Sequence, residues 1–110
     1  MHEYHTAILT LSKREQTTYS FAYGDSEGFV NFPLSIKGIV FSVLFVEKND
    51  HIKISFRSHG RFDVNLFAVR HYNGGGHMNA AGAETQEPLN EAVKNFMQLV
   101  KKYKKELNYE

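Results

Sequence analysis

A chain of 110 residues, 42% of them hydrophobic and 23% charged, has the size and composition of one globular domain rather than of several domains or a disordered segment. The absence of cysteine excludes disulfides and thiolate metal sites from the chain, and it favours a cytoplasmic location. The longest apolar run, residues 39–46, is too short to span a bilayer, so we expect no membrane association; the net charge of +1 identifies no class of partner.

The first elements predicted along the chain are a strand and a helix. Thr6–Leu11 has the apolar and β-branched composition of a short buried strand. Ser12 and Glu15 form a capping-box pattern, in which each side chain satisfies a backbone N–H of the other's residue. A helix is therefore predicted to begin at Lys13 and to end before Gly24.

A second helix and a hairpin are predicted next. Asp25 and Ser26 are suitable caps for a short helix that Pro33 stops or kinks. Residues 39–46 are hydrophobic almost without interruption, which is typical of a central strand covered on both faces. Residues 51–58 alternate instead, and the side chains expected to point inward are Ile52, Ile54 and Phe56. The polar turn between these two segments makes them a hairpin.

The second half of the chain predicts two helices with a strand between them. Asp63 can cap a helix that carries Val64, Phe67 and Ala68 on one face. Most of residues 78–86 are expected to form a strand. Pro88 then opens a long helix whose apolar residues recur at helical spacing: Leu89, Ala92, Val93, Phe96, Leu99, Val100 and Tyr103. The predicted fold is α/β or α+β, with a mixed sheet of four to five strands and helices packed on it.

The glycine run at residues 74–76 is the feature most suggestive of chemistry. Consecutive glycines are entropically costly, and they allow backbone N–H groups to turn toward an anion that approaches without meeting a Cβ. His77 adds a donor that titrates near neutral pH, and Arg57, Arg61 and Arg70 are close in sequence. The glycines fit either an anion-binding loop or a tight turn between a helix and a strand, and the neighbouring cations favour the anion.

Residues 74–82, Gly-Gly-Gly-His-Met-Asn-Ala-Ala-Gly, resemble the GGGHxxAAG motif of the DHHA1 domain, the C-terminal half of DHH-family phosphoesterases. The residues around this motif resemble the same family in the same order. They are Ser55-Phe-Arg-Ser58, Asp63-Val-Asn65, the segment 25–31 and Ile36-Lys-Gly38. The resemblance is to the compact members of the family that act as oligoribonucleases and phosphatases of 3′-phosphoadenosine 5′-phosphate, and it extends over most of residues 1–110.

The resemblance implies a division of labour. An N-terminal DHH domain, which this chain lacks, holds two divalent metals, typically manganese, that activate the attacking water, while the DHHA1 domain holds the substrate. The chain has no Asp-His-His triplet, and Asp50-His51 falls in a predicted hairpin turn, so we expect neither a metal site nor a catalytic residue in it. A start so near the first strand suits excision from a longer protein at a linker, and a natural start at Met1 is the alternative.

The resemblance also implies a set of substrate-binding residues. Arg57 and His77 are expected to hold phosphate or base, Arg57 because its guanidinium binds two oxygens at once. The alternative for Arg57 is an exposed residue at a strand end. Asn65 either orients the glycine segment or caps its own helix. The complete set is Arg57, Ser58, Asn65, Gly74, Gly75, Gly76, His77 and Asn79.

Other residues have less specific interpretations. Arg61 and Arg70 are expected to be solvated. Tyr72 is close enough to the glycines to stack on a base, although most aromatic residues lie at core spacing.

The expected function is binding of a nucleotide or short single-stranded nucleic acid for a DHH domain that cleaves short oligonucleotides or 3′-phosphoadenosine 5′-phosphate. Alternatives within the family are a cyclic-dinucleotide phosphodiesterase, a single-stranded DNA exonuclease and an exopolyphosphatase. Alanyl-tRNA synthetases carry a related domain, but their motif departs from Gly-Gly-Gly-His. Outside the family, the alternatives are a freestanding nucleotide- or RNA-binding module without catalysis and a structural or dimerising domain; a homo-oligomer is compatible with all of them.

Overall fold

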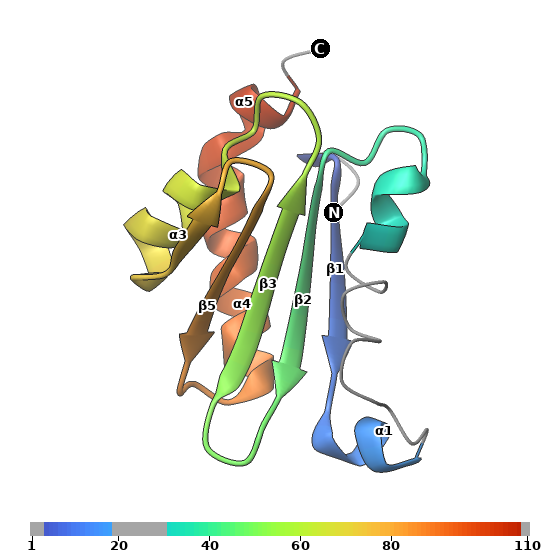
Figure 1. The fold of residues 1–110 in the computed structure, drawn as a ribbon, viewed down its shortest axis with the longest axis vertical. Helices are drawn as coiled ribbons and strands as arrows, with labels where there is room; N and C mark the ends of the chain where they lie inside the picture. The colour runs from blue at the N-terminus through green and yellow to red at the C-terminus, as the bar shows by residue number, and fades with distance from the viewer. Residues whose placement is uncertain (1–3, 19–30, 109–110) are drawn as a thin grey trace.

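The computed structural model describes residues 4–18 and 31–108. Its centre is a five-stranded mixed sheet in the order β1-β2-β3-β5-β4 (Figure 1). The strands are β1 (Thr6–Leu11), β2 (Phe41–Glu47), β3 (Ile52–Ser58), β4 (Gly75–His77) and β5 (Ala80–Thr85). The β1–β2 pair is parallel, and every other pair is antiparallel. The predicted mixed sheet of four to five strands is confirmed.

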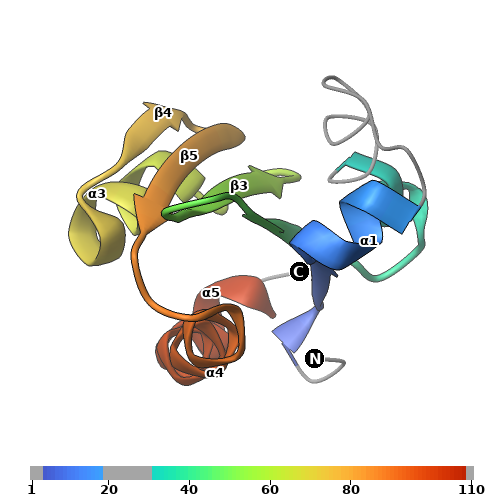
Figure 2. The ribbon, with the colours of Figure 1, turned by 90° about the horizontal axis from the view of Figure 1, so that it is seen from below.

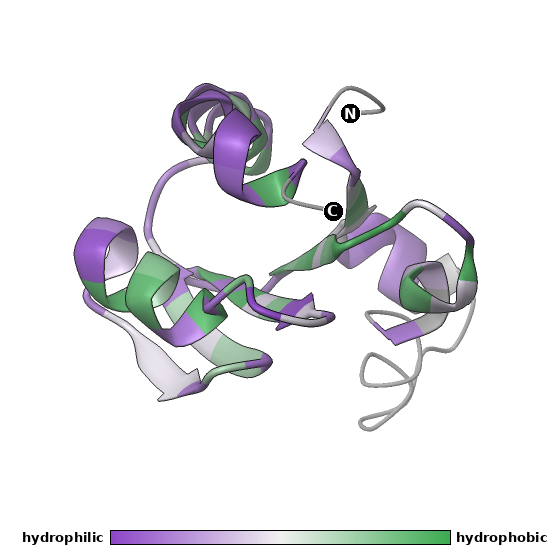
Figure 3. Ribbon diagram, turned by 90° about the horizontal axis from the view of Figure 1, so that it is seen from above, coloured by the Kyte–Doolittle hydropathy of each residue, from purple (hydrophilic) through white to green (hydrophobic). Residues whose placement is uncertain are grey.

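Helices lie on both sides of this sheet. They are α1 (Lys13–Thr18), α3 (Val64–Tyr72), α4 (Leu89–Val100) and α5 (Lys104–Leu107), with 3-10 turns η2 (Phe32–Ser35) and η3 (Lys101–Tyr103). Figure 2 shows α4 and α5 on one side of the sheet and α1 on the other. Residues of both polarities alternate around α4 (Figure 3), as expected for a helix that buries one face.

The main core is a cluster of aromatic rings contributed by four elements. Phe41 of β2, Phe56 of β3, Phe67 of α3 and Phe96 of α4 are all almost completely buried. Their ring centroids lie 5.2–6.3 Å apart, and several pairs have the edge-to-face geometry that aromatic rings prefer. Because α3 and α4 meet the same face of the sheet through these rings, the opposite face of β3 and β5 does not take part in this core.

The two middle strands explain why the sheet has two different faces. All residues of β2 from Phe41 to Val46 are buried, as predicted, because Phe41, Val43 and Phe45 face the aromatic cluster while Leu44 and Val46 pack with Leu11 on the other face. In β3 the inward residues are Ile52, Ile54 and Phe56, which confirms the predicted alternation. The outward residues of β3 therefore lie on the face opposite α4.

The predicted helix boundaries are partly confirmed. Helix α1 begins at Lys13 with the expected capping box, since Ser12 N donates to Glu15 Oε1 at 2.8 Å and Glu15 N donates to Ser12 Oγ at 3.1 Å. Asp63 caps α3 by accepting a hydrogen bond of 3.0 Å from Leu66 N. The predicted end of the first helix and the caps Asp25 and Ser26 lie outside the described residues.

Two corrections concern the segments around the glycines. Residues 75–77 form the edge strand β4 instead of a loop or a tight turn, and they pair antiparallel with β5. Helix α3 ends at Tyr72, its C-cap Asn73 adopts the left-handed conformation at φ 57°, and Gly74 N donates to Ala68 O at 3.0 Å. The strand predicted within residues 78–86 begins only at Ala80, because Met78 and Asn79 connect β4 to β5.

Candidate substrate-binding groove

An open groove of about 510 Å³ runs over the face of the sheet opposite α4. Its walls and floor come from three neighbouring strands, β3, β5 and β4. The residues that line it are Lys53, Ile54, Ser55, Arg57, Gly75, Gly76, Ala80, Ala81, Gly82, Ala83 and Glu84. The groove therefore contains Arg57 and part of the glycine motif, which lie far apart in the sequence.

Strand register places Arg57 and His77, two of the predicted ligand residues, in one row across the sheet. Arg57 of β3 pairs with Ala80 of β5, and Ala80 pairs with His77 of β4. Two strand spacings separate the backbones of Arg57 and His77, which is about 10 Å. Directly paired residues share a face of the sheet, so this row has a cation, a methyl group and an imidazole in succession.

The guanidinium of Arg57 is held by backbone carbonyl groups of β3 and β5. Its Nη1 donates to Phe56 O at 2.9 Å and lies 3.5 Å from Ala81 O on the neighbouring strand. The residue is only partly buried and lines the groove, so its forked guanidinium can be reached by a ligand there. Arg57 is thus a positioned cation, and its contact with substrate stays a prediction.

Close approach of β4 to β5 requires two of the glycines. A Cβ on Gly74 would lie 2.3 Å from Gly82 O, and one on Gly76 would lie 2.5 Å from Ala80 O. Neither position has room for a methyl group. Gly75 differs, because a Cβ there would meet Asn65 Oδ1 at 3.4 Å, an ordinary contact distance.

The side chain of Asn65 holds the glycine strand in place. Its Oδ1 accepts a hydrogen bond of 2.9 Å from Gly76 N, which joins α3 to β4. Of the two roles predicted for Asn65, the structure shows the orientation of the glycine segment, while Asp63 caps the helix. Because the Gly76 N–H already donates to Asn65, it is not available to a ligand. The contribution of Gly76 to the groove is the space left by its missing side chain.

Ser58 and Asn79 lie beside the groove and bind each other. Ser58 Oγ donates to Phe62 O at 2.6 Å and accepts from Asn79 Nδ2 at 2.9 Å. Asn79 Nδ2 also donates to Gly60 O at 3.2 Å. These contacts fix the turns after β3 and β4, and neither residue lines the groove. His77 is exposed at the end of β4.

Three residues near the motif lie away from the groove. Tyr72 packs on Phe56 at a centroid distance of 5.5 Å, so its ring belongs to the core and is not placed to stack on a base in the groove. Arg61 and Arg70 line a separate cavity of about 260 Å³ between α3 and the C-terminal helices.

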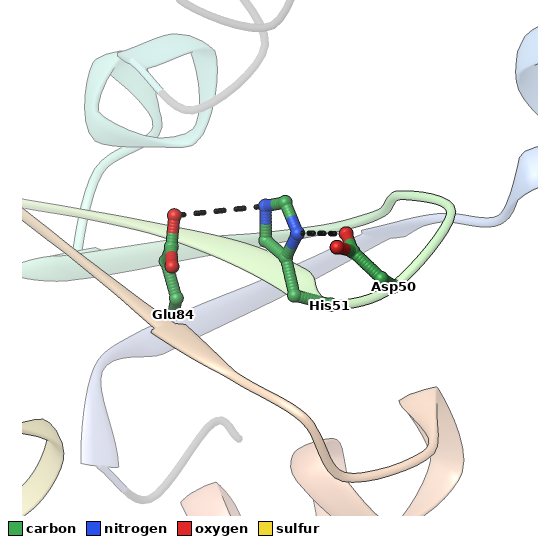
Figure 4. A network of polar contacts seen from close by, with 3 residues as sticks. All are labelled: Asp50, His51 and Glu84. Carbon is green, nitrogen blue, oxygen red and sulfur yellow. Dashed lines mark hydrogen bonds and ion pairs between the residues drawn. The ribbon is translucent and has the colours of Figure 1, made fainter.

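The pair Asp50-His51 lies in the β2–β3 turn, as predicted. This turn is at the end of the groove away from Arg57. His51 Nδ1 lies 2.7 Å from Asp50 Oδ1, and Nε2 lies 3.6 Å from Glu84 Oε2 (Figure 4). The neighbouring imidazole lowers the pKa of Asp50 through its hydrogen bond and its charge. Among the described residues, no group of three or more histidine and acidic side chains is arranged to hold a metal ion.

Lys53, Ser55 and Glu84 line the groove, but they were absent from the predicted set. Two of them could have been predicted from the alternation of β3. Because Ile52, Ile54 and Phe56 point inward, Lys53 and Ser55 must lie on the other face, together with Arg57. Glu84 had no such signal, since the small residues of β5 show no contrast between the two faces.

Comparisons with known proteins agree with this fold. The DHHA1 domain family matches residues 7–106. The chain is similar to the crystal structure of an exopolyphosphatase-related protein from Bacteroides fragilis, with 48% identity and a TM-score of 0.92. The alignment covers 97% of this chain and 32% of that one, so the chain spans about a third of that protein's length. The comparison with curated proteins found no match.

Two structures of low sequence identity share the fold. A pGpG-specific phosphodiesterase from Vibrio cholerae is 16% identical with a TM-score of 0.51, over 67% of this chain and 26% of that one. The C-Ala domain of alanyl-tRNA synthetase from Aquifex aeolicus is 13% identical with a TM-score of 0.57, over 86% of this chain and 89% of that one. The family match covers nearly the whole chain, and this protein therefore belongs to the DHHA1 domain family.

Proposed function

We propose that this chain is the substrate-binding domain of a DHH-family phosphoesterase, and that its groove holds the phosphate of a short oligonucleotide or of 3′-phosphoadenosine 5′-phosphate. The observation that carries the proposal is the row Arg57, Ala80 and His77, in which a positioned guanidinium and an exposed imidazole flank a methyl group. A phosphate over Ala80 receives donors from both sides. Charge-assisted hydrogen bonds of this kind are the strongest available to a solvent-facing site.

The glycine strand supports this function by leaving space. Gly75 and Gly76 line the groove, and Ala80 and Gly82 form its floor. Their small size lets a ligand approach the backbone closely. The hydrogen bond from Gly76 N to Asn65 keeps the strand in place before a ligand arrives, which reduces the ordering cost of binding.

The chemistry itself is assigned to a part of the parent protein other than this chain. We propose an N-terminal DHH domain with divalent metal ions, manganese being typical, to activate the attacking water. The DHHA1 domain then binds and orients the substrate.

A titration of the chain with 3′-phosphoadenosine 5′-phosphate, monitored by NMR amide shifts, tests the binding role. We expect Arg57, Gly75 and His77 to shift, with a dissociation constant on the order of millimolar, because two or three charge-assisted contacts at about 1.5–3 kcal/mol each must also offset association costs. Shifts confined to the C-terminal lysines, at positions 101, 102, 104 and 105, contradict the site.

Two arginine variants provide the matched comparison. Arg57→Ala should remove saturable binding, whereas Arg61→Ala makes the same change of charge outside the groove and should weaken binding less than twofold. Equal losses in the two variants mean that nonspecific charge attraction, rather than the groove, binds the nucleotide.

The 48% identity to an exopolyphosphatase-related protein favours polyphosphate as a second candidate substrate. A polyphosphate chain presents the same terminal oxyanion to Arg57 as a nucleotide does. The two candidates differ in the chemical groups that lie beyond that phosphate along the groove.

A further inference from the structure

The groove has two chemically different ends. Arg57 and Ala80 line one end, with His77 paired to Ala80 beside them, and Lys53 pairs with Glu84 at the other end. Four residues separate these rows along both β3 and β5, a distance of about 13 Å at the rise of an extended strand. A ligand bound to Arg57 and lying along the groove therefore extends toward Glu84.

The far end has an acidic character that the near end lacks. The Glu84 side chain is 72% exposed and lines the groove, and its carboxylate is 3.6 Å from His51 Nε2. The opposite nitrogen of that ring faces Asp50 (Figure 4). Lys53 pairs with Glu84 on this row, and the two carboxylates of Glu84 and Asp50 lie on either side of the His51 imidazole. At the far end of the groove, the charge of Lys53 is therefore opposed by a carboxylate, whereas the residues that line the near end with Arg57 include no carboxylate.

We infer that Glu84 determines specificity, making the groove select a nucleotide over a polyphosphate chain. This inference rests on the proposed function of the groove. A mononucleotide such as adenosine 5′-monophosphate has its charge at its single phosphate and carries hydroxyl or amino donors further on, which a carboxylate accepts. A polyphosphate chain of the same reach carries negative charge along its whole length, so its distal phosphates meet the Glu84 carboxylate and are repelled.

The floor between the two ends suits a flat, uncharged group. Gly82 and Ser55 form the row between those of Arg57 and Glu84, and Ser55 is buried. These short side chains leave space for a sugar or base over the strands. They provide no cation that could neutralise a middle phosphate.

The test is a comparison of adenosine 5′-monophosphate and inorganic tripolyphosphate on the 110-residue chain, by NMR titration at constant ionic strength. Glu84→Gln should tighten tripolyphosphate binding by roughly three- to tenfold, the size expected when one nearby like charge is removed in a solvated site. Nucleotide binding should stay the same or weaken. Glu91→Gln makes the same change of charge at an exposed position of α4, outside the groove, and should leave the ratio of the two affinities unchanged.

The outcomes separate this inference from the proposed function. If both ligands shift the Arg57, Gly75 and His77 amides but Glu84→Gln changes their affinities equally, or no more than Glu91→Gln does, Glu84 does not set specificity while the groove still binds phosphate. If neither ligand shifts these amides, the proposed function fails, and the inference fails with it.

Discussion

Asn65 Oδ1 accepts a 2.9 Å hydrogen bond from Gly76 N and so ties the first turn of α3 to the edge strand β4. The bond connects a residue of the Gly-Gly-Gly-His motif with a residue of the Asp63-Val-Asn65 segment, and it crosses from a helix to a strand of only three residues. Such a short edge strand needs contacts besides its ladder to stay in register.

Replacing Asn65 should therefore loosen the glycine strand. Asn65→Ala is expected to lower the free energy of unfolding by about 1 kcal/mol and to speed amide hydrogen exchange at Gly76, because one hydrogen bond is lost. Asn65→Asp is the control, since a carboxylate oxygen at the same place still accepts the bond. Unchanged exchange of Gly76 in Asn65→Ala would show that β4 is held by its pairing with β5 alone.

The three glycines should respond differently to alanine. Gly74→Ala and Gly76→Ala are each expected to cost about 1–3 kcal/mol, because the new methyl group would overlap Gly82 O or Ala80 O and force β4 away from β5. Gly75→Ala should cost clearly less than either, since its Cβ has ordinary contact distances. Urea denaturation of the three variants checks the order, and a Gly75 variant as unstable as the others contradicts it.

Replacing either of two buried serines by alanine should change the free energy of unfolding in opposite directions. Ser42 Oγ is buried with no hydrogen-bond partner among the described residues, so Ser42→Ala should leave stability unchanged or raise it by up to about 1 kcal/mol. Ser58→Ala removes a hydroxyl that bonds both Phe62 O and Asn79 Nδ2, and it should cost about 1–3 kcal/mol. Thermal or urea unfolding measures both variants, and a clear loss of stability in Ser42→Ala would reveal a partner for its hydroxyl.

His71 gives the domain a weak dependence on pH. Partial burial, with Lys102 and Arg70 nearby, lowers the pKa of His71 below its ordinary value of 6.5. Its Nε2 lies 2.6 Å from the Tyr103 hydroxyl, an arrangement that suits a neutral ring accepting the hydrogen bond. The unfolded chain therefore binds the proton more readily than the folded one.

The stability linked to His71 is complete above its ordinary pKa and falls as the pH decreases from there to the folded-state pKa, below which it stays constant. Titration of the His71 ring protons by NMR should give a midpoint below 6.5. A midpoint at or above this value would mean that the packing of α3 against Tyr103 does not disfavour the charged ring.

Local patterns in the sequence were enough to predict most elements. The capping box at Ser12 and Glu15, the cap at Asp63 and the alternation of Ile52, Ile54 and Phe56 were all confirmed, because each depends on residues within a few positions of one another. The prediction for the glycine strand was wrong for the opposite reason. Glycine has a low intrinsic preference for strands, and β4 exists because β5 and Asn65 hold it.

The sequence by itself was enough to predict the family of this protein and its candidate ligand residues, above all Arg57 and His77. Only the tertiary structure decided which groups share a surface. Strand register aligned Arg57 with His77 across Ala80 and placed Lys53 opposite Glu84. Tertiary packing engaged Ser58, Asn79 and Tyr72 in structural contacts. Pairing between strands joins residues that are distant along the chain, and no short-range pattern encodes that alignment.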